Sequence, residues 1–291
     1  HSVLKYYYVK KEVEIMRLNR VYCVDCREAI KQLKDDSVQL VITSPPYALQ
    51  RKNQYDSVPP DEYPAFTLSW VKALFPKLKE DGVIALNLAE YVSNGVMSTY
   101  AMETIVSIVE ETPLKLLDVV EWVNSSPSSL GRPYRPRRGN QQIYLLSKLT
   151  TDKVKIFPLA VGKLSSYGVV TDISNRLDKA EKTNKLIRGK NVLVHSASNT
   201  ERGLRHPAMF PLAIPEFFIN LFTTEDDLVL DPFCGSGTTC RIAKRLNRKY
   251  LGFDTCERYC KTAEKTLRKI KRGDYIGKSN PNISKSSSVK G

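Results

Sequence analysis

The stretch DLVLDPFCGSGTTCRIAKRL, residues 227–246, joins an apolar run, a glycine-rich turn and a segment of helical periodicity. The run ending at Asp231 predicts a buried strand, and the residues from Thr238 onward predict a helix. Gly235 and Gly237 would let the backbone approach a ligand closely, and the amino end of the helix offers free N–H groups. This order is typical of the ligand-binding edge of a parallel α/β sheet.

Acidic residues near this turn restrict the ligand. Asp231 precedes the glycines, and Asp254 ends the next apolar run, YLGFD. A P-loop would need Gly-Lys-Ser/Thr, and a dinucleotide fingerprint would need a third Gly where Cys240 stands. Asp231 would repel a pyrophosphate but suits a cation, and Asp254 has the position that binds ribose hydroxyls in doubly wound folds. S-adenosylmethionine, with an ammonium, a sulfonium and a ribose diol, therefore fits best.

The same pattern extends over most of the chain. Strands are expected at 20–25, 38–43, 83–88, 116–124, 227–231 and 250–254, and helices at 27–33, 63–82, 101–111, 215–223, 238–247 and 257–273. Strands that alternate with helices predict an α/β fold with a doubly wound, mostly parallel sheet. Its ligands are expected at the carboxyl ends of the strands.

Residues 125–205 depart from this pattern. They open with a Pro-, Gly-, Ser- and Arg-rich stretch that predicts a long loop, and only 141–148 is strand-like. We expect this region to be too polar for the central sheet and to form a small appended lobe. The other expected divisions are an N-terminal extension (1–19), two parts of one domain (20–124 and 206–273) and a flexible tail (274–291).

The composition indicates the partners. Lys and Arg number 45 against 31 Asp and Glu, a formal charge of +14. This excess favours a polyanion, although a charged surface that only maintains solubility is the alternative. The chain has no signal peptide and no apolar stretch long enough for a membrane span, so a soluble intracellular protein is expected. Monomer and homodimer both remain open.

Six cysteines raise the question of a metal. Cys23-x-x-Cys26 and Cys256-x-x-x-Cys260 could together form a zinc site, but no His lies near them. We therefore expect buried, reduced thiols and no metal.

The stretch ITSPPYALQRK, residues 42–52, is unusual at the end of an apolar run. Two prolines cannot continue a sheet ladder, and Pro45 forces Ser44 into an extended conformation. A rigid turn would be a sufficient explanation for this motif alone. Beside a cofactor turn in the same sheet, however, the loop is expected to be catalytic.

Thr43–Tyr47, followed far downstream by Asp231–Thr239, resembles the amino-DNA methyltransferases. The motif order is similar to the circularly permuted beta class, in which the catalytic motif comes first, then the target-recognition region and then the cofactor loop. The resemblance extends from about Val21 to Lys271. It implies a methyltransferase-type sheet with one antiparallel strand, double-stranded DNA as partner and 125–205 as the target-recognition lobe.

The resemblance also implies the cofactor site. Asp25 corresponds to an acidic contact to adenine, and HPAMFPLAIPEFF (206–218) is similar to a segment that packs on the cofactor. The residues expected to bind S-adenosylmethionine are Asp25, Phe210, Pro211, Asp231, Pro232, Phe233, Cys234, Gly235, Ser236, Gly237 and Asp254.

The expected catalytic residues are Ser44, Pro45, Pro46 and Tyr47. An exocyclic amine is a poor nucleophile because its lone pair is delocalised into the ring. Ser44 Oγ and the Pro45 carbonyl could accept its two hydrogens and localise that lone pair, while the prolines hold them rigid. Tyr47 could stack on a base rotated out of the duplex.

Contacts to DNA are expected from Arg51, Lys52, Trp122, Arg132, Arg135, Arg137 and Arg138. Core packing is an equal alternative for Trp122, and a solvated loop is the alternative for the four arginines. Other possible functions are a catalytically inactive DNA-binding scaffold and a methyltransferase for RNA or protein amines.

The motif also bears on the target base. Relatives with Ser before Pro-Pro mostly methylate cytosine N4, and those with Asp or Asn mostly methylate adenine N6. Ser44 therefore favours N4 of cytosine, with adenine N6 as the alternative. A physical reason could be that the serine proton stays free to reach a ring nitrogen such as N3.

Overall fold

The structure, a computed structural model, describes residues 16–48, 58–124, 139–158, 160–161, 163–164, 186–187, 191–195 and 211–274. A central sheet of eight strands has the order β1-β12-β11-β2-β3-β7-β6-β10. All neighbouring pairs are parallel except those that β7 forms with β3 and β6, so the expected single antiparallel strand is confirmed. The strands are β1 (Arg20–Cys23), β2 (Val38–Thr43), β3 (Leu78–Leu88), β6 (Lys115–Asn124), β7 (Asn140–Ser147), β10 (Val192–His195), β11 (Leu228–Asp231) and β12 (Lys249–Asp254).

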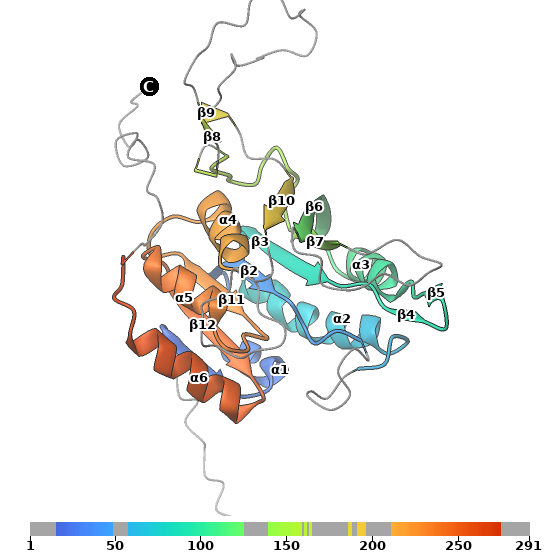
Figure 1. The fold of residues 1–291 in the computed structure, drawn as a ribbon, viewed down its shortest axis with the longest axis horizontal. Helices are drawn as coiled ribbons and strands as arrows, with labels where there is room; N and C mark the ends of the chain where they lie inside the picture. The colour runs from blue at the N-terminus through green and yellow to red at the C-terminus, as the bar shows by residue number, and fades with distance from the viewer. Residues whose placement is uncertain are drawn as a thin grey trace, which may run out of the picture.

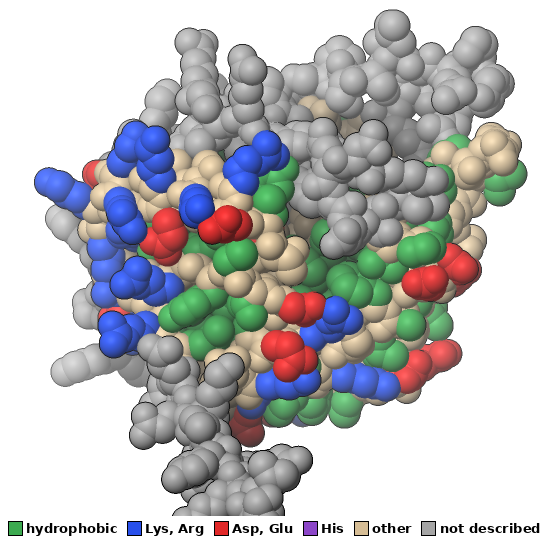
Figure 2. Space-filling view, turned by 90° about the horizontal axis from the view of Figure 1, so that it is seen from below, with side chains coloured by type: hydrophobic (Ala, Val, Ile, Leu, Met, Phe, Trp, Pro, Cys, Tyr) green, Lys and Arg blue, Asp and Glu red, His purple; other side chains and the backbone are tan. Residues whose placement is uncertain are grey.

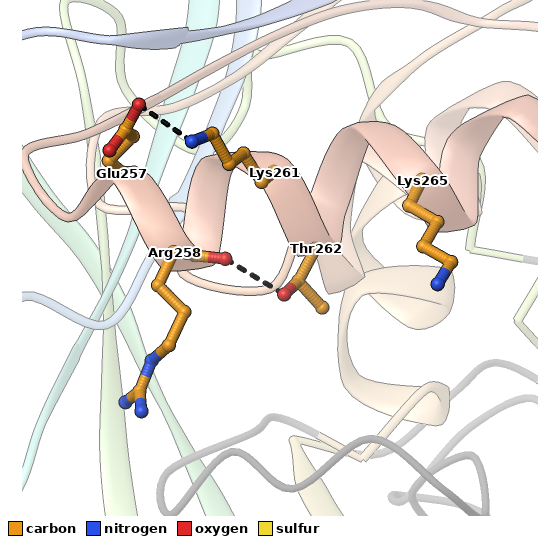
Figure 3. A pocket seen from close by; sticks show the side chains of 5 residues that line it. All are labelled: Glu257, Arg258, Lys261, Thr262 and Lys265. Atoms are coloured by element: carbon orange, nitrogen blue, oxygen red, sulfur yellow. Dashed lines mark hydrogen bonds and ion pairs between the residues drawn. The ribbon is translucent and has the colours of Figure 1, made fainter.

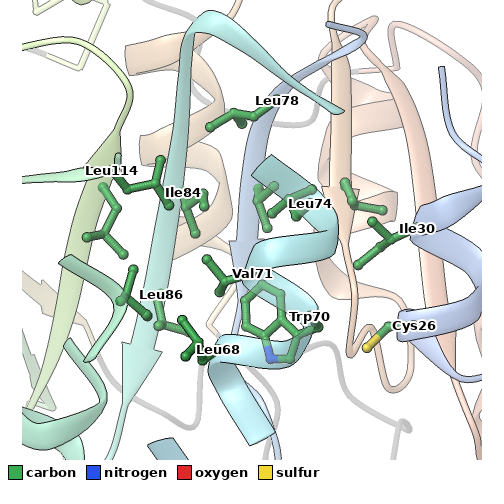
Figure 4. Close-up of a cluster of buried hydrophobic side chains, with 14 of the residues drawn as sticks. Cys26, Ile30, Leu68, Trp70, Val71, Leu74, Leu78, Ile84, Leu86 and Leu114 are labelled. Carbon is green, nitrogen blue, oxygen red and sulfur yellow. The ribbon is translucent and has the colours of Figure 1, made fainter. Parts of the chain in front are cut away.

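Helices cover both faces of this sheet (Figure 1). One hydrophobic cluster contains α1 (Cys26–Lys31), α2 (Tyr63–Leu74) and α3 (Tyr100–Glu111). The other contains α4 (Ala213–Phe222), α5 (Thr238–Arg245) and α6 (Glu257–Arg268). Alternation along β3 joins the two clusters, since Ile84 and Leu86 belong to the first and Val83 and Ala85 to the second. Figure 4 shows side chains of α1, α2 and β3 meeting in the first cluster.

The expected helix at 63–82 is too long. Helix α2 ends at Leu74, a short 3-10 turn covers Phe75–Lys77, and β3 already begins at Leu78. Pro76 lies in that turn, where it cannot donate the hydrogen bond that a continuing helix needs. Gly82, expected to stop the helix, lies within the strand instead, and its carbonyl accepts a bond from the Ser147 hydroxyl at 2.7 Å.

The expectation that 125–205 lies apart from the central sheet is wrong for two segments. Strand β7 lies between β3 and β6, with residues 143–147 buried, and β10 extends the sheet beyond β6. The reason is visible in β7, where two glutamines are followed by an apolar run that suits a fully enclosed strand. Short pairs β4–β5 (Val92–Ser93 and Val96–Met97) and β8–β9 (Lys163–Leu164 and Leu186–Ile187) form two further small sheets.

Within the described part of the chain, no helix combines the length and the apolar character that a membrane span requires.

Candidate active site

The loop expected to bind the cofactor, residues 231–237 and called the cofactor loop below, connects β11 to α5. Gly235 and Gly237 both have positive φ angles, of 51° and 81°, which side-chain-bearing residues rarely adopt. A side chain at Gly237 would also place its Cβ 2.8 Å from the Cβ of Ala263 on α6. These two glycines therefore let the chain turn tightly and bring the start of α5 against α6.

Asp231 is the first residue of the loop, and it is 4% exposed. Its Oδ1 accepts hydrogen bonds from the Thr43 hydroxyl at 2.9 Å and from the Phe233 N–H at 3.2 Å. Burial raises the pKa of Asp231 to about 6, although these bonds and the nearby Thr239 hydroxyl lower it in part. The group is thus held ionisable near neutral pH in a setting that favours a cationic neighbour.

Asp254 supports the loop from the neighbouring strand. One of its oxygens accepts the Gly235 N–H at 2.9 Å, and the other accepts the Cys256 N–H at 2.8 Å. Burial raises the pKa of Asp254, and the two N–H bonds oppose that rise. Each carboxylate oxygen retains a second lone pair, so the loop contact leaves acceptor capacity for a hydroxyl.

Asp25 lies at the end of β1 and begins α1. Its side chain accepts the Arg27 N–H at 2.8 Å and pairs with the Arg27 guanidinium at 2.6 Å. The Arg27 hydrogen bonds hold the pKa of Asp25 below its ordinary value. The expected acidic contact is therefore an ionised group. It lies at the same edge of the sheet as Asp254, because Cys23, two residues before Asp25, pairs in register with Asp254.

The apolar residues of the cofactor loop anchor it to the core. The Phe233 ring meets the rings of Trp70 and Phe66 at centroid distances of 5.6 and 5.9 Å. Cys234 and Cys240 pack on the other side against β12, where a Cβ at Gly252 would lie within 2.9 Å of both sulfurs. Pro232 is buried as well. These contacts fix the loop without using its polar groups.

One polar atom of the loop remains without a partner. Ser236 is 3% exposed, and its Oγ has no hydrogen-bond partner among the described residues. A buried hydroxyl of this kind is rare unless a ligand or water completes it. The Ser236 hydroxyl and the carboxylates of Asp231, Asp254 and Asp25 form a set of polar groups that suits a cationic, hydroxyl-bearing cofactor and not a phosphate.

The loop expected to be catalytic, residues 44–47 and called the catalytic loop below, begins directly after β2 and belongs to a network of neutral side chains. Ser44 Oγ lies 2.7 Å from the Tyr47 hydroxyl, which donates to Gln141 Oε1 at 2.9 Å. Asn87 Nδ2 lies 2.8 Å from both the Tyr47 and Gln141 oxygens and 3.3 Å from Ser44 Oγ. Asn87 is fully buried at the end of β3, and Gln141 lies on β7. Pro45 is buried, whereas Pro46 is partly exposed.

The catalytic and cofactor loops are next to each other. Strands β2 and β11 are parallel neighbours, so both loops leave the sheet at its carboxyl edge. The bond from Thr43 to Asp231 joins the last residue of β2 to the last residue of β11. The structure thus brings together the two motifs that lie 188 residues apart in sequence.

The structure also describes two other expected site residues, Trp122 and Pro211. Trp122 is 5% exposed in the second hydrophobic cluster and donates its indole N–H to the His195 carbonyl at 3.2 Å, which favours core packing. Pro211 is buried just before α4. The residues Arg51, Lys52, Arg132, Arg135, Arg137, Arg138 and Phe210 lie outside the described residues.

All six cysteines are described and are free thiols. Four are buried, Cys256 is partly exposed and Cys23 is exposed. Among the described residues no three His, Cys, Asp or Glu side chains are grouped as a metal would require.

A shallow surface hollow is lined by Glu257, Arg258, Lys261, Thr262 and Lys265 (Figure 3). All five residues come from α6, and Lys261 pairs with Glu257 at 2.8 Å. The view from below shows Lys and Arg side chains gathered on the side where α6 lies (Figure 2). Because this hollow includes no residue of either motif, we regard it as part of a solvated basic surface and not as the cofactor site.

Sequence reasoning missed Asn87 and Gln141. Asn87 is a polar residue inside the apolar run VIALNL, and a fully buried amide in such a run needs hydrogen-bond partners. That signal was available, but its partners could not be named without the strand order.

Comparison with known proteins agrees with this geometry. A DNA methylase family model, that of the N6 and N4 methyltransferases, matches residues 38–265. The chain therefore belongs to the N6/N4 DNA methylase family, and the resemblance inferred from its motifs is confirmed.

Individual relatives cover most of the chain. It is 29% identical over 279 residues to the type II methyltransferase M.PvuII of Proteus hauseri, spanning 82% of this chain and 80% of that protein. The solved PvuII DNA methyltransferase (cytosine-N4-specific) superposes with a TM-score of 0.66 over 86% of both chains. The M1.HpyAVI–SAM complex, 24% identical, shares the fold with a TM-score of 0.55 over 85% of this chain and 98% of that one.

Proposed function

We propose that this chain transfers a methyl group from S-adenosylmethionine to the N4 amine of a cytosine in double-stranded DNA, as modification enzymes of restriction–modification systems do. The observation that carries the proposal is the junction of the two loops. A serine–proline–proline–tyrosine loop of neutral acceptors is hydrogen-bonded, through Thr43 and Asp231, to a glycine loop with buried carboxylates. The M1.HpyAVI complex, which shares this fold, supports the choice of cofactor.

The residues of the cofactor loop would hold S-adenosylmethionine by charge and hydroxyl contacts. Asp231 suits a cationic group, Asp254 a ribose hydroxyl and Ser236 Oγ a polar group that reaches the buried end of the loop. Asp25 has the position expected for the adenine contact. When bound, the cofactor supplies an electrophilic methyl group within reach of the adjoining catalytic loop.

Ser44 and the Pro45 carbonyl would orient the target amine. Two acceptors that bind the two amine hydrogens turn the nitrogen lone pair out of conjugation and toward the methyl group. The two prolines limit the motion of these acceptors, and Tyr47 would stack on the flipped base. The amine nitrogen forms its bond to the methyl carbon while the bond from that carbon to the cofactor sulfur breaks, which leaves S-adenosylhomocysteine. The methylated amine then releases one proton to solvent, and no covalent intermediate with the protein is required.

The choice of cytosine N4 over adenine N6 depends on two observations. Ser44 stands where serine accompanies N4 methylation in the family, and the solved PvuII relative is described as cytosine-N4-specific. The expected DNA surface comprises Arg51, Lys52 and the arginines at 132, 135, 137 and 138, with the part of 125–205 outside β7 and β10 as target reader. Within a cell, such an enzyme would be found with the DNA.

A methyl-transfer assay tests the proposal. The protein is incubated with cofactor labelled in its methyl group and, in separate reactions, with unmethylated genomic DNA, total RNA and a mixture of proteins. We expect label in DNA alone. Label in RNA or protein alone, or no label with cofactor binding intact, would overturn the proposal.

A further inference from the structure

The hydrogen-bond network beside Ser44 has a fixed direction, and Gln141 sets it. We infer that Gln141 is a positioning residue that, through Tyr47, holds the Ser44 hydroxyl as an acceptor for the target amine. This inference rests on the proposed function and adds a residue outside both motifs to it.

The direction follows from the chemistry of the two amides. The Gln141 carbonyl oxygen can only accept, and it lies 2.9 Å from the Tyr47 hydroxyl and 2.8 Å from Asn87 Nδ2. Tyr47 must therefore donate its single proton to Gln141. Asn87 Nδ2 can only donate, and it lies 2.8 Å from the Tyr47 oxygen.

Two contacts of Ser44 remain: its oxygen accepts from Asn87 Nδ2 at 3.3 Å, and it meets the Tyr47 hydroxyl. Since the Tyr47 proton is engaged by Gln141, the 2.7 Å contact between Ser44 and Tyr47 has Ser44 as its donor. The Ser44 proton is thus directed to the Tyr47 oxygen, and the Ser44 oxygen keeps one lone pair for the target amine. In this arrangement the Ser44 proton is engaged by Tyr47 and is not free for a ring nitrogen such as N3.

The burial of the network makes its direction matter. Asn87 is fully buried, and Ser44 and Tyr47 are only partly exposed, so water competes weakly for these bonds. Without the Gln141 acceptor, the Tyr47 proton would no longer be held away from the Ser44 oxygen and could point to it. The Ser44 proton would then face the amine hydrogens, and donor would meet donor.

The neighbouring Gln142 provides a matched control. It follows Gln141 on β7, so its side chain projects to the opposite face of the strand. There it donates to Glu121 Oε1 at 2.9 Å and accepts from the Tyr144 hydroxyl at 2.6 Å. Neither partner belongs to the candidate site.

The test compares Gln141→Met, which keeps length but removes the acceptor, with Gln141→Glu, which keeps an acceptor, and with Gln142→Met. Single-turnover methyl transfer to unmethylated genomic DNA, cofactor affinity and thermal melting are measured for each variant. For Gln141→Met we expect a rate loss of roughly tenfold to a hundredfold, the range seen when a hydrogen-bond partner that orients a ligand-contacting residue is removed. Cofactor affinity should stay unchanged, Gln141→Glu should recover most of the rate, and Gln142→Met should match the wild type.

A double-mutant cycle with Tyr47→Phe separates positioning from packing. Because Gln141 acts through the Tyr47 hydroxyl, Gln141→Met should cost nothing further in the Tyr47→Phe background. Additive losses in the cycle, or a Gln141→Met rate equal to the wild type, would overturn the inference. If Gln141→Met melts early, Gln141→Leu takes its place in the same cycle. If the wild-type protein itself transfers no methyl group to DNA, the proposed function fails and the positioning role fails with it.

Discussion

The two loops at the carboxyl edge of the sheet solve different chemical problems. The catalytic loop after β2 contains the hydroxyls of Ser44 and Tyr47, which lie beside the amides of Asn87 and Gln141, so the groups of this network are neutral. The cofactor loop after β11 has carboxylates and positive-φ glycines instead. Neutral acceptors can polarise an uncharged amine without fixing a charge beside it, whereas carboxylates suit a cationic cofactor. Under the proposed function, catalysis would belong to the first loop and cofactor binding to the second.

Replacing Ser44 tests the catalytic side of this division most strongly. Ser44→Ala removes a preorganised acceptor, so methyl transfer should fall by about several hundred-fold. Calorimetric titration with S-adenosylmethionine should give nearly the wild-type affinity. A variant that keeps its turnover would show that Ser44 is not the acceptor.

Replacing Asp231 tests the binding side. Asp231→Asn removes the charge but keeps the size, and loss of a hydrogen bond to a charged group, worth about 1.5–3 kcal/mol, should weaken cofactor binding by roughly tenfold to a hundredfold. Single-turnover methyl transfer at saturating cofactor should change much less than for Ser44→Ala. Unchanged affinity would remove Asp231 from the cofactor site.

The shape of the cofactor loop is tested by its glycines. Gly237→Ala introduces a positive-φ side chain and a 2.8 Å approach to Ala263, and should lower the free energy of unfolding by about 2–4 kcal/mol. Gly273→Ala is the control, because Gly273 has a φ of 74° but no neighbour within 4 Å of an added Cβ. Urea denaturation should show the smaller loss for Gly273→Ala, and equal losses would mean that the contact with α6 is unimportant.

The buried carboxylate also predicts a pH dependence. Burial raises the pKa of Asp231 to about 6, so the ionised form that suits a cation is depleted as the pH falls through that value. Cofactor affinity should be nearly constant above about pH 7 and fall by at most tenfold per pH unit below pH 6. The free energy of unfolding of the ligand-free protein should instead rise as the pH falls through 6, because the pKa of Asp231 is higher in the folded than in the unfolded chain. In the Asp231→Asn variant, neither cofactor affinity nor stability should change with pH near 6. If either pH dependence persists in this variant, another group causes it.

The sequence predicted the elements and the motif loops well because both are local. Strand β11, the turn at Gly235 and Gly237 and helix α5 lie where the pattern places them. The junction of the loops was predictable too, since parallel neighbours share their carboxyl edge. The Asn87–Gln141 contact was not, because it depends on β7 lying beside β3, an antiparallel pairing between segments 54 residues apart.

The end of α2 shows a second limit of prediction from sequence. Charged residues at 79–81 resemble the polar end of a helix, yet they begin a strand whose later residues are buried. Pairing of Leu78 and of residues 83–86 with β2, and of residues 83–88 with β7, holds the strand on both sides of this charged segment, and local propensity does not decide its conformation. From sequence, core packing and a role in the site were equal alternatives for Trp122. Its burial beside β10, which pairs with β6, favours the core.

Identification of the methylated nucleoside tests the central claim most directly. DNA treated with the protein and S-adenosylmethionine is digested to nucleosides, which are separated and identified by mass spectrometry. We expect N4-methylcytosine in the treated DNA and none in DNA treated with the Ser44→Ala variant. N6-methyladenine as the main product would contradict the assignment of the base, and the absence of any methylated nucleoside would contradict the assignment of the activity.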